Sequence, residues 1–236
     1  MTETATFGLP LVEAAQAQKH VTVNEAFARI DALSALTLAS IGTSAPPPAP
    51  ADGEVHAVGA GASGAWFGAD GALALFLNGG WDFVTPKPGW RAWSAVDGHG
   101  VTYDGVAWVP GLVSAGTSGG AVVQRTVEIE HGMSSGATSL AVGAVPGNAL
   151  ILGVSARVVS AIGGAASMDI GVPGAADRFG AALGTGAGAS VADIRATPEV
   201  YAGGADVLLT ANGGSFDGSG TLRLAVHLTE LRAPRV

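Results

Sequence analysis

Histidines and carboxylates are the side chains of this sequence that could bind a metal or transfer protons. The five histidines are spread along the chain, with no two within five residues of each other: His20, His56, His99, His131 and His227. This spacing contains no local metal-binding motif, and the absence of cysteine excludes disulfides and thiolate-bound metals. His131 and His227 fall in predicted strands, where a partly exposed histidine is favoured over a ligand. We expect neither a metal nor a cofactor.

Sequence motifs for catalysis are not found either. The chain has no Walker loop, and the glycine runs at 59–61 and 184–188 lack the strand-to-helix context of a phosphate loop. A glycosidase needs two facing carboxylates, about 5 to 9.5 Å apart. The second half of the chain carries scattered carboxylates: Asp169, Asp177, Asp193, Glu199, Asp206 and Asp217. Nothing in the sequence brings two of them together, so we expect no enzymatic activity.

Aromatic side chains offer a better basis for binding. All five tryptophans lie in one stretch of the chain: Trp66, Trp81, Trp90, Trp93 and Trp108. Phe76 is followed five positions later by Trp81, and Tyr103 is followed five positions later by Trp108, in both cases across a turn that contains glycine. This repeat predicts two β-hairpins in which the aromatic rings are cross-strand neighbours.

Sugar recognition is one function that such residues could serve. Aromatic rings stack on the apolar faces of sugars, while carboxylates and amides bind the hydroxyl groups. The candidate glycan-binding residues are Trp90, Trp93, Tyr103 and Asp104. The alternative is that the tryptophans form the core of a small β domain, which is the more common use of tryptophan in such domains.

A helix is predicted near the N-terminus, after an extended arm at 1–10 and a short helical stretch at 11–20. Thr22 and Glu25 fit a capping box, and the helix should run for about 17 residues, ending near Ser40 or Gly42. Apolar side chains follow three apart: Phe27, Ile30, Leu33 and Leu36. This stripe packs either on the core of its own domain or in a helical bundle between copies of the chain.

Composition excludes several classes of function. The formal charge is −8, and no cluster of Lys and Arg exists, so nucleic acid is not an expected partner. No apolar run approaches the roughly 20 residues of a membrane-spanning helix, and the N-terminus lacks the basic region of a signal peptide. Only 13% of the residues are charged, which favours a stable homo-oligomer with buried surfaces.

Changes in composition divide the chain and predict a mainly β fold. Residues 1–44 form the arm and helix, and 45–112 form a Trp-rich antiparallel β domain that begins with a proline-rich connector. A Gly/Ser linker at 113–121 precedes a region, 122–236, of β-branched runs separated by glycine-rich turns. This last pattern predicts a β-sandwich, with a jelly roll as the favoured arrangement.

One stretch closely resembles a known family. Residues 8–33, which begin Gly-Leu-Pro-Leu-Val-Glu, resemble an uncharacterised domain that is common in alphaproteobacterial prophages and gene transfer agents. Residues 58–66 and 89–93 fit the same family, so the resemblance covers roughly 7–110. Gene transfer agents contain similar proteins as head spike (head fibre) components, which sit on capsid vertices and attach the particle to cell-surface polysaccharide.

The resemblance implies a virion component that is made in the cytoplasm and displayed on the head of a phage-like particle. It implies a homo-oligomer, either a trimer or a pentamer, whose partners are capsid vertex or spike-base proteins and the host polysaccharide. The helix would anchor the particle end or join the copies. The family supplies no catalytic residues. A stand-alone glycan-binding module is the alternative, and a capsule-degrading enzyme is less favoured. The identity of the sugar, the role as spike base or fibre and the receptor-binding domain stay open.

Overall fold

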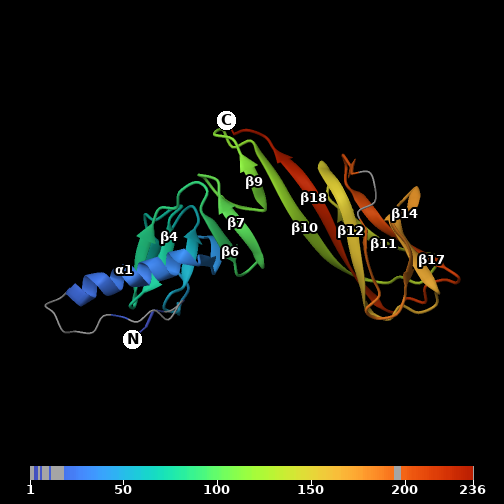
Figure 1. Cartoon of the computed structure of the whole chain (residues 1–236), viewed down its shortest axis with the longest axis horizontal. Helices are drawn as coiled ribbons and strands as arrows, with labels where there is room; N and C mark the ends of the chain where they lie inside the picture. Colours follow the sequence, from blue (N-terminus) through green and yellow to red (C-terminus); the bar gives the residue numbers. More distant parts are fainter. Residues whose placement is uncertain (1–2, 5, 7–10, 12–18, 194–197, 236) are drawn as a thin grey trace. The chain divides into compact units, whose positions relative to one another are not determined.

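The computed structural model describes residues 3–4, 6, 11, 19–193 and 198–235. The chain divides into two compact units, Met1–Leu112 and Val113–Val236. Strands are the main regular structure of both units, and the described residues include one α-helix, near the N-terminus (Figure 1). The expected mainly β fold is therefore confirmed. No helix in the described ranges is long and apolar enough to cross a membrane.

The first unit contains two four-stranded sheets of the same design. In each sheet a short strand pairs in parallel with the first strand of a three-stranded antiparallel meander. One sheet has the order β1 (Thr37–Leu38), β6 (Arg91–Ser94), β7 (His99–Tyr103), β8 (Trp108–Pro110). The other has the order β2 (Ser40–Thr43), β3 (Val55–Val58), β4 (Leu73–Leu77), β5 (Gly80–Val84). The aromatic repeat in the sequence thus reflects a structural repeat of whole sheets.

Both predicted hairpins are confirmed. Phe76 and Trp81 are direct cross-strand partners in β4 and β5, with ring centroids 5.0 Å apart. Tyr103 and Trp108 are partners in β7 and β8, with centroids 5.4 Å apart. Asn78 and the glycine that follows it have φ angles of 52° and 79°, which is the geometry of the tight hairpin turn that Asn-Gly favours.

The helix differs from the prediction at both ends. Helix α1 spans Lys19–Ser34, so Thr22 lies inside it and the predicted capping box is wrong. The helix also stops before Ser40, because residues 37–43 form β1 and β2 instead. This stretch is rich in β-branched residues, which favour strands, and it pairs with β6 and β3 far along the sequence. The expected arm and most of the expected short helix at 11–20 lie outside the described residues.

The predicted apolar stripe does not form one face of the helix. Leu33 and Leu36 pack in the core of the first unit beside Ala32, and Leu36 lies beyond the last helical residue. Ile30 is 55% exposed and Phe27 is partly buried. The C-terminal part of the stripe therefore packs on its own domain, while Ile30 remains available for other contacts.

The core of the first unit has two parts on opposite faces of the β2–β5 sheet. The larger cluster includes Leu38, Leu73 and Leu75. It joins α1, this sheet and the inner face of the sheet formed by β1, β6, β7 and β8. The smaller cluster surrounds Trp66, which is fully buried. Trp66 lies in a 3-10 turn, Gly64–Trp66, and the next strand begins at Leu73. The turn allows the indole ring to cover the sheet.

The second unit is a β-sandwich, as expected. Its strands are β9 (Leu112–Ala115), β10 (Ala121–Gly132), β11 (Thr138–Val145), β12 (Ala149–Ser160), β13 (Ser167–Val172), β14 (Ala175–Gly184), β15 (Ser190–Asp193), β16 (Glu199–Val200), β17 (Ala205–Asn212) and β18 (Thr221–Arg232). One sheet has the order β15-β12-β18-β10-β9, with β16 beside β12, and the other has the order β11-β17-β13-β14. Figure 1 shows the long strands β10, β12 and β18 side by side.

This strand order is that of a jelly roll. When the two short strands β9 and β16 are set aside, the remaining strands pair as first, last, third and sixth in one sheet and as second, seventh, fourth and fifth in the other. That is the double Greek key of jelly-roll domains. Buried aliphatic residues such as Leu209, Leu224 and Val226 fill the space between the sheets. The Gly/Ser stretch 113–121 is not wholly a linker, since its first residues belong to β9, next to β10.

Candidate functional site

The five tryptophans divide into four that pack inside the first unit and one that does not. Trp66 is fully buried, and Trp81 packs against its cluster. Trp90 and Trp108 pack against the larger cluster. Trp93 differs from the others because it is 52% exposed. Core packing therefore explains four of the tryptophans, and a binding role is worth considering for Trp93.

The structure does not bring the four predicted glycan-binding residues together. Along β6 exposed and buried residues alternate, so Trp93 lies on the outer face and Trp90 reaches the core. Tyr103 contacts the ring of Trp108. Oδ1 of Asp104 accepts hydrogen bonds of 2.9 Å from the backbone amides of residues 106 and 107, which closes the β7–β8 turn. Trp93 is the one member of the set on the outer face of the sheet.

The strands place a different set of neighbours beside Trp93. Its cross-strand partner in β7 is Gly100, and its partner in β1 is Thr37. Two residues along β6, Arg91 lies opposite Thr102. Residues that pair across a sheet share one face, as do residues two apart in a strand. We call this set, Thr37, Arg91, Trp93, Gly100 and Thr102, the Trp93 platform.

Gly100 keeps the platform open. A Cβ atom placed on Gly100 would have nothing within 4 Å, so no side chain of the described residues fills the space next to the indole of Trp93 on that side. Arg91 is exposed, and none of the described residues forms an ion pair or hydrogen bond with its guanidinium. The platform therefore combines an aromatic ring with an uncommitted cation and the hydroxyl groups of Thr37 and Thr102.

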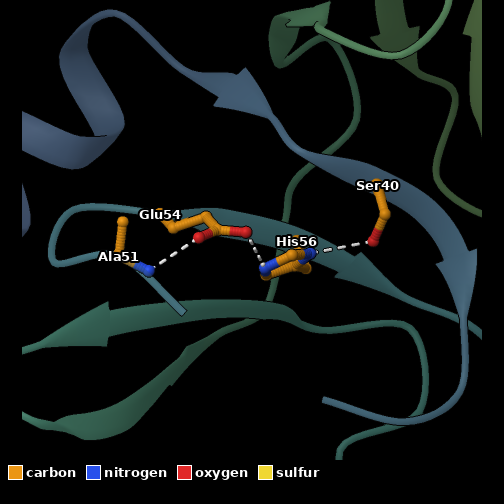
Figure 2. A network of polar contacts seen from close by, with 4 residues as sticks. All are labelled: Ser40, Ala51, Glu54 and His56. Carbon is orange, nitrogen blue, oxygen red and sulfur yellow. Dashed lines mark hydrogen bonds and ion pairs between the residues drawn. The ribbon is translucent and has the colours of Figure 1, made fainter. Parts of the chain in front are cut away.

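A polar network around His56 was not foreseen from the sequence (Figure 2). The Nδ1 atom of His56 shares a hydrogen bond of 2.9 Å with the hydroxyl of Ser40, its partner in the parallel β2–β3 pair. On the other side of the ring, Nε2 lies 3.0 Å from Oε1 of Glu54, although the direction of approach does not fit a hydrogen bond. Oε2 of Glu54 accepts a hydrogen bond of 2.8 Å from the amide of Ala51.

Ser40, His56 and Glu54 have the composition of a nucleophilic triad, but their surroundings indicate a structural role. His56 is 4% exposed, and its ring centroid lies 5.2 Å from that of Trp66 and 5.8 Å from that of Trp81. Burial lowers the pKa of His56, although the carboxylate of Glu54 opposes this shift. A buried histidine in an aromatic cluster, hydrogen-bonded to its partner strand, serves to connect β2 and β3.

A groove lies between α1 and the β4–β5 hairpin. Its volume is about 720 Å³, and its polar lining includes Glu25, Arg29, Asn78 and Asp82. Nε of Arg29 lies 3.1 Å from Oδ2 of Asp82, which ties the helix to β5. Trp81 also borders this groove, but its indole packs with Phe76 on the opposite face of the sheet. Trp81 is the one aromatic residue among the described residues that border the groove.

Polar side chains in the second unit mostly bind other residues of the same unit. His227 shares hydrogen bonds with Thr126 at 3.1 Å and Ser155 at 2.9 Å, which bridges three neighbouring strands. Asp169 accepts hydrogen bonds from the amide of residue 182 and from Asn212. The hydroxyl of Ser219 donates to Asp217 and lowers its pKa. These contacts stabilise strands and loops. Within the described residues, no group of three His, Asp or Glu side chains gathers as a metal site would require.

Comparisons with known proteins gave a match to one family model and a likeness to a solved structure. A family model described as a protein of unknown function (DUF2793) matches residues 23–109, which lie within that unit. The match agrees with the resemblance of this region to an uncharacterised domain. Among solved structures, the chain is similar to one from the cyanophage Pam1 capsid asymmetric unit, with 18% sequence identity and a TM-score of 0.32. That likeness covers 50% of this chain and 89% of the other. No curated protein matches the sequence.

Proposed function

We propose that this protein is a non-enzymatic surface component of a phage-like particle, and that it binds cell-surface polysaccharide through the Trp93 platform. The observation that carries the binding proposal is the half-exposed indole of Trp93 beside Gly100, where an added Cβ atom would have nothing within 4 Å. An aromatic ring in this setting offers a flat apolar surface. The hydroxyl of Thr102 can bind a sugar hydroxyl, and the hydroxyl of Thr37, which donates to the carbonyl oxygen of Ala35 at 3.3 Å, can still accept a hydrogen bond.

Two features support the placement on a particle. Residues 8–33 resemble a domain of prophages and gene transfer agents, where similar proteins form head spikes. The second unit is a jelly roll, an architecture that recurs in viral capsid and lectin domains. The jelly roll supports this placement by likeness of architecture, since one fold serves many functions.

A homo-oligomer that contacts capsid vertex or spike-base proteins is part of the proposal. Its support is the low charge content and the exposed apolar side chains of α1, Val23 at 38% and Ile30 at 55%. These two residues lie seven positions apart and therefore share one face of the helix. Light scattering should give a trimeric or pentameric mass for the full chain, and Ile30→Glu should lower that mass. A monomer at micromolar concentration would contradict the oligomer.

The binding proposal can be tested with two variants that act in different ways. Trp93→Ala removes the ring, whereas Gly100→Val keeps the ring and fills the open space beside it. Both should abolish binding of host capsular polysaccharide, measured by biolayer interferometry on immobilised polymer. Phe67→Ala is the matched control, because Phe67 is a large exposed aromatic residue, 87% exposed, that lies outside the platform.

If both variants still bind the polysaccharide, the Trp93 platform is not the binding site. If Phe67→Ala loses binding, the site lies at Phe67 and not at Trp93. Absence of enzymatic activity is tested on the same polymer by following reducing ends over time. A steady release of reducing ends by the wild-type chain would overturn that part of the proposal.

A further inference from the structure

Arg91 makes the Trp93 platform different from a purely neutral sugar site. Arg91 and Trp93 are two residues apart in β6, so their side chains leave the same face of the sheet about 6.5 Å apart. Arg91 is exposed and has no ion-pair partner among the residues that the structure describes. By contrast, Arg29, Arg125, Arg178 and Arg223 each pair with a carboxylate within the chain.

We infer that the platform recognises an acidic saccharide, with the sugar ring stacked on Trp93 over Gly100 and its carboxylate bound by Arg91. This inference rests on the proposed function and adds the class of ligand. A guanidinium presents two parallel N–H groups that fit a carboxylate. The span between Arg91 and Trp93 is comparable to a single uronic acid residue, so one sugar or two adjacent sugars can contact both side chains. Thr102, opposite Arg91, adds a hydroxyl at the same end.

The charge of the whole chain restricts this ligand further. The formal net charge is −8. The Trp93 platform contains a single arginine, Arg91, and not a cluster of cations. A densely charged polyanion gains its affinity from many cations at once, and this surface does not supply them. The expected ligand is therefore a polysaccharide with isolated carboxylates among neutral sugars.

A matched pair of small sugars tests the inference on the full-length protein. Methyl β-D-glucuronoside and methyl β-D-glucoside differ only in a carboxylate in place of a hydroxymethyl group. Titrations monitored by NMR would follow the indole Nε1–H of Trp93 and the Nε–H of Arg91. We expect the glucuronoside to bind at least about tenfold more tightly, because a hydrogen bond to a charged group contributes more than a neutral one. Added salt should reduce this preference.

Variants separate the inference from the proposed function. Arg91→Gln should bring the two sugars to equal affinity without abolishing binding, and Arg91→Lys should restore only part of the preference, because lysine lacks the planar fork. Trp93→Ala should abolish the binding of both sugars. Equal affinities in the wild type, or an unchanged preference in Arg91→Gln, would overturn the acidic class while the saccharide site stands. If neither sugar shifts the Trp93 signal, both the inference and the proposed site fail. Tighter binding of polygalacturonate than of a sparsely charged polymer would contradict the limit on charge density.

Discussion

The two units solve the problem of forming a core in different ways. In the first unit, a mainly aliphatic cluster stands beside a smaller one in which a few large rings occupy much of the volume. The rings of Trp66, Trp81, Phe76 and His56 there make edge-to-face or tilted contacts. The second unit has one continuous cluster of buried residues, almost all aliphatic, between two sheets. Each aromatic side chain contributes a larger buried area than an aliphatic one.

This difference bears on how the binding residue is recognised. In an aliphatic sandwich, a single exposed tryptophan would stand out in the sequence. In the first unit, Trp93 is hidden among four tryptophans that the core requires. The contrast also provides a measurement, because all five tryptophans lie in the first unit. Tryptophan fluorescence therefore reports on that unit, while far-UV circular dichroism reports on both.

The largest expected effect is that of Trp66→Ala, because one ring fills most of its cluster. Trp66 is fully buried, and removing it should cost the first unit about 3 to 5 kcal/mol of unfolding free energy. Urea denaturation followed by fluorescence from the remaining tryptophans would measure the loss. Phe67→Ala, at the next and largely exposed position, should change stability by less than about 0.5 kcal/mol. Similar effects at both positions would refute the description of the first core.

A comparable truncation in the sandwich should be confined to the second unit. Leu224 is fully buried between the sheets, and Leu224→Ala should cost about 2 to 5 kcal/mol. The transition followed by circular dichroism should shift, whereas the fluorescence transition should not. If both transitions shift equally, the two units unfold together, and the difference between their cores does not give them separate stabilities.

Acidification should weaken both units, through a different histidine in each. Burial lowers the pKa of His56 in the first unit and of His131 in the second. The unfolded chain then binds protons more readily than the folded one. Each contribution to stability is complete above the ordinary histidine pKa of about 6.5 and decreases as the pH falls toward the lower folded value.

The variant His56→Gln should reduce the pH dependence in that range for the fluorescence transition and leave the dependence of the second unit in place. Stability profiles from urea titrations between pH 5 and 8 would show this. An unchanged profile in His56→Gln would mean that another group in the first unit causes the loss.

Apart from the control Phe67→Ala, the smallest expected effect on stability is that of Gly100→Val. Nothing lies within 4 Å of a Cβ atom at this position, and valine favours strands more than glycine does. The free energy of unfolding should stay within about 1 kcal/mol of the wild-type value. The expected change is an increase. Thermal unfolding followed by fluorescence would measure it. A loss of several kcal/mol would show that the platform is not open, and would invalidate this variant as a probe of binding.

Much of the fold was predictable from local patterns in the sequence. The Phe76–Trp81 and Tyr103–Trp108 repeats indicated two hairpins, because aromatic spacing and an intervening turn are local properties. Alternation and glycine-rich turns indicated the sandwich. The parallel strands at 37–43 were missed for two reasons. They pair with residues that come later in the chain, and they directly follow apolar residues at helical spacing that end at Leu36.

The candidate site was predicted only in part, and the reason is the direction of side chains. Trp90 and Trp93 are three apart, so in a strand they lie on opposite faces, and the sequence does not indicate which face meets the core. The network of Ser40, Glu54 and His56 gave no usable signal either, since it depends on the pairing of β2 with β3.

The sequence by itself determined the mainly β character, the lack of cysteine chemistry, the low charge and the concentration of tryptophan in one stretch. These are properties of composition and of short-range spacing. The tertiary structure decided which tryptophan faces solvent, because that depends on how two sheets and a helix enclose the other four. It also placed Thr37 beside Trp93, because β1 pairs with a strand far along the chain, whereas Gly100 reaches Trp93 through the local β6–β7 hairpin.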